Sequence, residues 1–235
     1  MPEIKFPYGR ETLSFDIPES RYAGSLLSKM HAYVPEKSPR ELVREAMAKP
    51  IGTERLCELA KGKNKIVIIA SDHTRPVPSK VIIPPMLEEI RSANPNADVT
   101  ILIATGFHRA TTREELVNKF GEEIVAREKI VVHDCGADDT HVKIGTLPSG
   151  GELIINRLAA EADLLLAEGF IEPHFFAGFS GGRKSVLPGV ASRKTVMYNH
   201  NGQFIASPYA RTGILRIEII GTHRVDISIR FSAIA

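Results

Sequence analysis

Four short apolar runs, separated by segments with helix-like ends, constrain the fold of this chain most. They cover residues 65–70, 98–104, 129–133 and 162–167 and indicate buried strands. Ser38 and Thr112 each open a capping box, with a glutamate three residues further on, and so mark helix starts. Strands that alternate with helices predict an α/β fold, here a Rossmann-like, largely parallel sheet flanked by helices.

Smaller elements complete this prediction. Two strands at 3–8 and 11–17 predict a small β-hairpin at the N-terminus, and 141–146 with 151–157 predict a second hairpin. Helices are expected at 53–60 and in a segment that ends near Ala93. Pro84 and Pro85 are expected to begin the main part of the latter helix, because proline is tolerated in a first turn but not inside a helix.

The composition is that of an ordinary soluble globular protein, with 43% hydrophobic and 25% charged residues in a chain of 235. A net charge of +2 gives no electrostatic footprint for nucleic acid or an anionic membrane. No apolar run approaches the roughly 20 residues of a membrane span, and the N-terminus lacks the apolar core of a signal peptide. Cys57 and Cys135 form neither a metal-type spacing nor a disulfide framework. We therefore expect a cytoplasmic protein without nucleic acid or membrane partners.

Polar loops follow three of the predicted strands directly. They lie at 71–76, 105–109 and 168–188. Because parallel strands align their carboxyl ends, these loops should converge on one crevice. The side chains expected to meet there are Asp72, Arg75, His108, His174 and Lys184.

The third loop is rich in glycine and indicates a phosphorylated ligand. It reads EGFIEPHFFAGFSGGRKSVLP and contains Gly178, Ser180, Gly181, Gly182 and Lys184. The Walker A pattern does not fit, because an arginine separates the last glycine from the lysine, and the Rossmann G-x-G-x-x-G fingerprint is absent. The loop thus argues against ordinary ATP or NAD sites. Its lysine could pair with a phosphate or form a covalent bond to a cofactor.

Each of these residues also has a purely structural explanation. A single histidine is more often a surface or hydrogen-bonded residue than a catalyst, Asp72 could cap a turn, and Arg75 and Lys184 could be solvated charges. Two histidines in one crevice nevertheless suggest two acid–base groups, which is what a racemase needs on opposite faces of one carbon. A metal site built by protein alone is poorly supported, since H-x-H, H-E-x-x-H and C-x-x-C are absent.

Four segments resemble the nickel-dependent lactate racemase family. They are DHTRPVPS (72–79), TGFHRATTREEL (105–116), EGFIEPHFFAGFSGGRKSVLPGVAS (168–192) and NHNGQFI (199–205). The resemblance covers roughly residues 1–215, which correspond to the larger N-terminal, cofactor-binding catalytic domain of that family.

The resemblance implies a nickel-pincer nucleotide, a pyridinium mononucleotide that carries thioacid groups and nickel. Lys184 would hold it covalently, the loop residues Gly178, Ser180, Gly181 and Gly182 would surround it, and His200 would complete the nickel coordination. Enzymes that make this cofactor are expected partners.

The resemblance also implies a reaction, the racemisation of a 2-hydroxy acid, most simply lactate, by hydride transfer through a 2-keto acid. His108 and His174 would be the catalytic acid–base pair, Arg75 would bind the substrate carboxylate, and Asp72 would support that arginine or the cofactor. The cofactor would perform the difficult step.

The resemblance to the family ends near residue 215. Residues 216–235 are expected to be a divergent tail in place of the family's second domain, so that this chain would not racemise lactate by itself. Two alternatives stay open: a remnant that binds only the cofactor or an anionic ligand, and an epimerase of another 2-hydroxy acid. The missing dinucleotide fingerprint disfavours a conventional dehydrogenase.

Overall fold

The computed structural model describes residues 2–214, and the chain divides into two compact units between Lys37 and Ser38. The first unit holds the predicted hairpin, β1 (Glu3–Tyr8) and β2 (Glu11–Asp16), which pair antiparallel. Two 3-10 turns follow, η1 (Glu19–Arg21) and η2 (Lys29–Ala32). The tail predicted at 216–235 lies outside the described residues.

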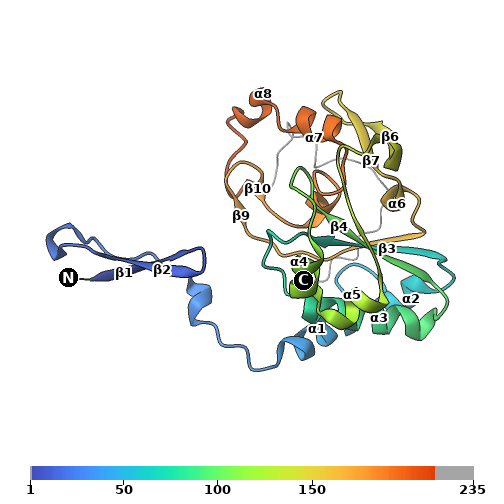
Figure 1. Ribbon diagram of the computed structural model, residues 1–235, viewed down its shortest axis with the longest axis horizontal. Helices are drawn as coiled ribbons and strands as arrows, with labels where there is room; N and C mark the ends of the chain where they lie inside the picture. Colours follow the sequence, from blue (N-terminus) through green and yellow to red (C-terminus); the bar gives the residue numbers. More distant parts are fainter. Residues whose placement is uncertain (1, 215–235) are drawn as a thin grey trace. The chain divides into compact units, whose positions relative to one another are not determined.

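The second unit is built on a four-stranded sheet in the order β5-β4-β3-β8, in which every neighbouring pair is parallel (Figure 1). The strands are β3 (Lys65–Ser71), β4 (Asp98–Ala104), β5 (Lys129–Val132) and β8 (Leu164–Ala167). The predicted α/β architecture with a parallel sheet and an N-terminal hairpin is confirmed.

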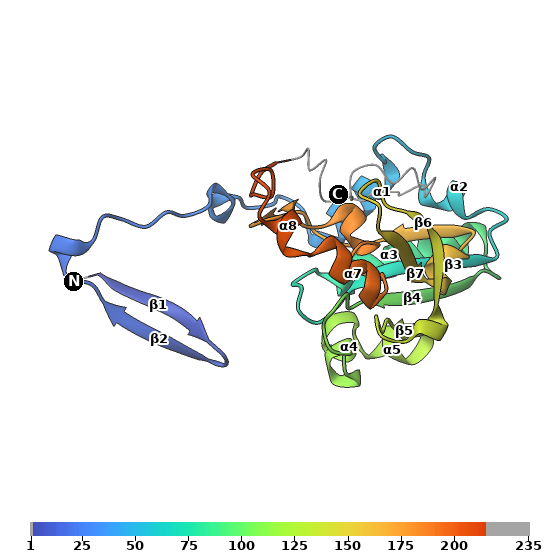
Figure 2. The same ribbon diagram turned by 90° about the horizontal axis from the view of Figure 1, so that it is seen from above.

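Both faces of this sheet are covered, because the apolar residues of each strand alternate between two cores. Ile66 and Ile68 face the helices α1 (Pro39–Ala48), α2 (Leu56–Ala60), α3 (Ser79–Ala93), α4 (Arg113–Phe120) and α5 (Glu122–Arg127). Val67 and Ile69 face the other core. That core is closed by β7 (Glu152–Asn156), α6 (Arg157–Ala160), residues 186–191 and α7 (Arg193–Asn199). Strand β6 (His141–Thr146) pairs with β7. Figure 1 shows α7, β6 and β7 on one side of the sheet and α1, α2, α3 and α5 on the other, and Figure 2 shows the same layers from above.

Local signals predicted many of these boundaries. The capping boxes at Ser38 and Thr112 are both formed, and the second hairpin pairs antiparallel with an irregular register between Lys143 and Gly145. Strand β8 begins two residues later than expected. The carboxylate of Asp163 there accepts the backbone amides of Asn64 and Lys65 instead.

The expected role of the two prolines is wrong. Helix α3 begins at Ser79, so that Pro84 and Pro85 lie inside it. A proline has no backbone N–H, so each of the two removes one helical hydrogen bond. This cost is the reason to expect them in the first turn of the helix. The helix continues through them because Ile83, Met86 and Ile90 are buried against the sheet. The second helix is shorter than predicted, at 56–60, and α5 was not predicted.

Strand order decides where the loops meet. From β3 the chain runs through β4 to β5 on one side and then returns to place β8 on the other side of β3. A crevice therefore forms at the carboxyl ends of β3 and β8, where connections depart in opposite directions. The segment after β8 adds the short strands β9 (Pro173–His174) and β10 (Gly178–Phe179), a 3-10 turn η4 (Gly182–Ser185) and, after α7, helix α8 (Gly202–Ile205).

Within residues 2–214, none of the helices has the length and apolar character to cross a membrane.

Candidate functional site

A cavity of about 410 Å³ opens at the carboxyl ends of β3, β4 and β8. The loops after these strands and the end of α7 form its walls, so the predicted convergence of the three loops is confirmed. The predicted site residues that line the cavity are Asp72, Arg75, His108, Ser180, Gly181, Lys184, His174 and His200.

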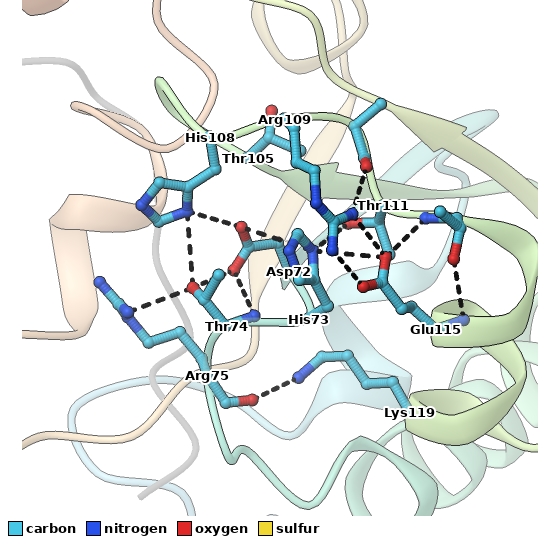
Figure 3. A network of polar contacts seen from close by, with 12 residues as sticks. Asp72, His73, Thr74, Arg75, Thr105, His108, Arg109, Thr111, Glu115 and Lys119 are labelled. Atoms are coloured by element: carbon cyan, nitrogen blue, oxygen red, sulfur yellow. Dashed lines mark hydrogen bonds and ion pairs between the residues drawn. The ribbon is translucent and has the colours of Figure 1, made fainter. Parts of the chain in front are cut away.

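Asp72 and His108 form a close pair across two loops. Asp72 is only 1% exposed, and its Oδ2 lies 2.7 Å from the Nδ1 of His108 (Figure 3). Its Oδ1 accepts hydrogen bonds from the backbone N and the Oγ1 of Thr74, at 3.1 and 2.6 Å. Burial alone would raise the pKa of Asp72, but the hydrogen bonds from Thr74 and His108 outweigh it and hold that pKa below its ordinary value. An ionised Asp72 fixes the proton of His108 on Nδ1, which leaves Nε2 free to accept one.

Arg75 extends from the same loop into the cavity. Its Nη1 donates to the Oγ1 of Thr74 at 3.2 Å, and its backbone carbonyl accepts a hydrogen bond from the Nζ of Lys119 at 3.0 Å (Figure 3). The guanidinium is therefore lightly held, and its planar fork suits a carboxylate.

His174 is half-buried and electrically neutral at ordinary pH. Its Nδ1 accepts backbone amides from Phe176 and Ala177, at 3.4 and 3.2 Å, so the proton of the neutral ring lies on Nε2. Burial, followed by the positive charges of Lys184 and Arg75, lowers its pKa to about 4. The hydrogen-bonding states of His174 and His108 are thus opposite: the free nitrogen of one donates and that of the other accepts.

Lys184 places a primary amine in the cavity under conditions that favour its neutral form. Burial lowers its pKa to about 8, and the charge of Arg75 adds to this effect. Within residues 2–214 the amine has neither an ion pair nor a side-chain hydrogen bond. A half-buried amine of this kind is more nucleophilic than a solvated lysine.

His200 caps the C-terminus of α7 and faces the same cavity. Its Nδ1 lies 3.1 Å from the carbonyl of Val196, which leaves Nε2 for another partner. Burial lowers the pKa of this ring, so the imidazole is neutral and can ligate a metal. In the described part of the chain no three histidine, cysteine or carboxylate side chains come together as a metal site. A metal at His200 would therefore need ligands from a cofactor.

The glycine-rich loop divides into residues inside and outside the cavity lining. Ser180 and Gly181 line it, whereas Gly178 and Gly182, in the part of the chain described, do not. Gly178 pairs with His174 in the β9–β10 ribbon, and Gly182 opens η4. Contact of any of the four with a cofactor stays a prediction.

Three residues of the site received no role from the sequence: Thr74, Lys119 and Glu168. Thr74 stands two residues after Asp72, the spacing of an Asx turn, and Glu168 directly follows β8, so both carried a local signal. Lys119 carried none, because its approach to Arg75 depends on the packing of α4.

The lactate racemase N-terminal domain matches residues 8–213. The chain belongs to this family. Two lactate racemases, from Thermoanaerobacterium thermosaccharolyticum and Lactiplantibacillus plantarum, are each 58% identical to it over 215 residues, or 92% of the chain. The resemblance inferred from the sequence motifs is confirmed.

Solved structures agree with this family assignment. The lactate racemase apoprotein from T. thermosaccharolyticum superposes with a TM-score of 0.84 at 56% identity, over 94% of this chain and 51% of that one. A protein from Thermotoga maritima, 22% identical, shares the fold with a TM-score of 0.57 over 68% of this chain and 40% of that one. The chain spans about half the length of the curated lactate racemases it matches, 50% and 51%.

Proposed function

We propose that this protein acts in the racemisation of a 2-hydroxy acid, with lactate as the first candidate. The observation that carries the proposal is the pairing of His108 and His174 in one cavity with opposite hydrogen-bonding states. A racemase must take a proton from the hydroxyl of one enantiomer and return one to the oxygen of the other. The identity to lactate racemases supports lactate as the substrate.

The side chains of the cavity divide this work. Arg75 binds the substrate carboxylate through its fork. His108 takes the hydroxyl proton on Nε2, while Asp72 holds its ring and stabilises the imidazolium that forms. His174 serves the opposite enantiomer, and the Nε2–H of its neutral ring hydrogen-bonds to the substrate oxygen. A second proton would sit on Nδ1, which must then release the amides of Phe176 and Ala177. It becomes more favourable once Arg75 is neutralised by the carboxylate, because that positive charge lowers the pKa of the ring.

The cavity also fits the nickel-pincer nucleotide that the family resemblance implies. Lys184 offers an amine whose lowered pKa, about 8, makes the neutral form accessible for a covalent bond, His200 offers a neutral imidazole for nickel, and the metal's other ligands would come from the organic group. The chemistry supplied by this cofactor, when bound, is reversible acceptance of a hydride from carbon 2. Asp72, Ser180 and Gly181 line the same space and would contact the cofactor. Enzymes that make the cofactor would be partners in maturation.

The test is co-expression of the 235-residue chain with a cofactor-making pathway. Mass spectrometry should find an adduct on the peptide with Lys184, and nickel should co-purify. D-lactate should yield L-lactate when the chain is joined to the second half of a full-length relative, and the 235-residue chain is assayed beside it. His108→Asn should lower that rate by two or more orders of magnitude while the adduct and nickel remain. An adduct without turnover of any 2-hydroxy acid would favour a binding function alone. Absence of an adduct would overturn both the racemase function and a function of binding the cofactor alone.

A further inference from the structure

Glu168 is a buried carboxylate that the chemistry above leaves without a role. It is the first residue after β8, and it is only 4% exposed. Its Oε1 accepts hydrogen bonds from the backbone N of Ser71 at 3.2 Å and from its Oγ at 3.3 Å. The Oγ of Ser79 lies 2.8 and 3.0 Å from its two oxygens. Burying a carboxylate is costly unless such donors satisfy it.

These contacts join the two ends of one loop. Ser71 is the last residue of β3 and Ser79 the first of α3, and the loop between them carries Asp72 and Arg75. One carboxylate therefore fastens the loop at both ends, at the point where β3 and β8 diverge. From the side of α4, Lys119 holds the same loop in the middle, through the carbonyl of Arg75.

Glu168 and Lys119 also interact electrostatically. Burial raises the pKa of Glu168 above its ordinary value, and the hydrogen bond from Ser79 and the charge of Lys119 offset only part of this rise. Burial likewise lowers the pKa of Lys119, and the negative charges of Glu168 and Asp72 raise it. Each group thus favours the ionised form of the other across the base of the loop.

Arg75 depends on this fastening more than Asp72 does. Asp72 has its own hydrogen bonds to Thr74 and His108, which hold it from within the loops. The guanidinium of Arg75 has one hydrogen bond, to Thr74, within the described residues. Its reach into the cavity is therefore set mainly by the backbone of the loop.

We propose that Glu168 is a positioning residue that fastens the 71–79 loop and so sets the place of Arg75 for the substrate carboxylate. This assignment rests on the proposed function. Glu168 lines the cavity, but its oxygens are taken up by the loop, and a carboxylate in contact with a carboxylate substrate would repel it.

Hydrogen–deuterium exchange of the unloaded chain tests the fastening without any need for activity. Glu168→Ala should speed exchange in residues 71–79 about tenfold, as expected when buried hydrogen bonds to a charged group are lost. Glu168→Gln should have a smaller effect, because its amide oxygen can still accept the Ser71 amide. Ser79→Ala frees one end of the loop only, and serves if Glu168→Ala does not fold.

Glu128 offers a matched control. Its side chain is 5% exposed and ion-paired to Arg91 at 2.6 Å, and it does not line the cavity. Glu128→Ala and Glu128→Gln should lower stability while leaving exchange of residues 71–79 unchanged. Equal exchange in the Glu168 and Glu128 variants would overturn the proposal.

In the loaded protein, joined to the second half of a full-length relative, Glu168→Ala should raise KM for lactate about tenfold and lower kcat much less, because Arg75 moves while Asp72 and His108 stay paired. Glu168→Gln should recover part of the KM, and the Glu128 variants should change neither constant. A fall in kcat with unchanged KM would overturn the role in carboxylate binding. If the loaded wild-type protein turns over no 2-hydroxy acid even when joined to the second half of a full-length relative, the proposed function fails, while the exchange result still decides whether Glu168 holds the loop.

Discussion

The fold lowers the pKa of the Lys184 amine, and this change favours the covalent bond of the proposed function. The amine has a pKa of about 8, lowered by burial and by Arg75, whereas the exposed amine of Lys61 has its pKa raised by Glu58. Trace acetylation across pH 7 to 10, read by peptide mass spectrometry, should show a midpoint near pH 8 for Lys184 and severalfold slower labelling of Lys61 at pH 8. Lys184→Arg removes the labelled site. A labelling rate at position 184 that still climbs steeply above pH 9 would contradict this prediction.

The pKa of His174 depends on the charge of Lys184. Because burial and then Lys184 and Arg75 lower its pKa to about 4, Lys184→Met should raise that pKa by up to about one unit. An NMR titration of the imidazole Cε1–H measures the change. Lys194→Met is the control, since Lys194 is exposed and ion-paired to Glu152. An unchanged titration in Lys184→Met would mean that burial and the charge of Arg75, without Lys184, keep the ring neutral.

At the scale of elements, the turn from β10 into η4 depends on one glycine more than on its neighbour. Gly181 has φ +79°, and a Cβ there would lie 2.5 Å from the carbonyl oxygen of Phe170. Gly182 has φ +57° with no atom within 4 Å of such a Cβ. We expect Gly181→Ala to lower the free energy of unfolding by about 3 kcal/mol and Gly182→Ala by about 1 kcal/mol. Urea unfolding compares them, and equal losses would show that backbone strain rather than the close contact decides.

At the scale of the whole molecule, acid sensitivity should come partly from His133. This ring is 1% exposed between the carbonyl of Ala191, Asn156 and the edge of His141, and burial lowers its pKa to about 4. Below about pH 6.5 this histidine is protonated in the unfolded chain but stays neutral in the folded protein. Stability is therefore lost as the pH falls from about 6.5 toward 4. Between pH 7 and 5 this loss is about 2 kcal/mol.

His133→Gln should therefore flatten the dependence of unfolding free energy on pH, whatever its effect on stability at pH 7. Part of the slope should persist, because burial also lowers the pKa of His141. Urea unfolding at pH 7, 6 and 5 gives both slopes. Parallel curves for the wild type and the variant would assign the acid sensitivity to other groups.

The sequence by itself determined the elements whose signals are local. The strand at 98–104 is found at the predicted bounds, and the capping boxes at Ser38 and Thr112 form as expected, because alternation, caps and turns act over a few residues. It also indicated that Asp72, His108 and Lys184 would meet, since the carboxyl ends of parallel strands share one edge of a sheet. Motif resemblance added the family.

Only the tertiary structure decided what depends on contacts between distant segments. Helix α3 runs through Pro84 and Pro85 because its buried face gains more than the two missing hydrogen bonds cost. Opposite hydrogen-bonding states of His108 and His174 depend on Asp72 in one case and backbone amides in the other. The contact of Glu168 with Ser71 joins residues 97 positions apart, at a junction fixed by strand order. Such contacts have no local signature, because packing of the whole sheet creates them.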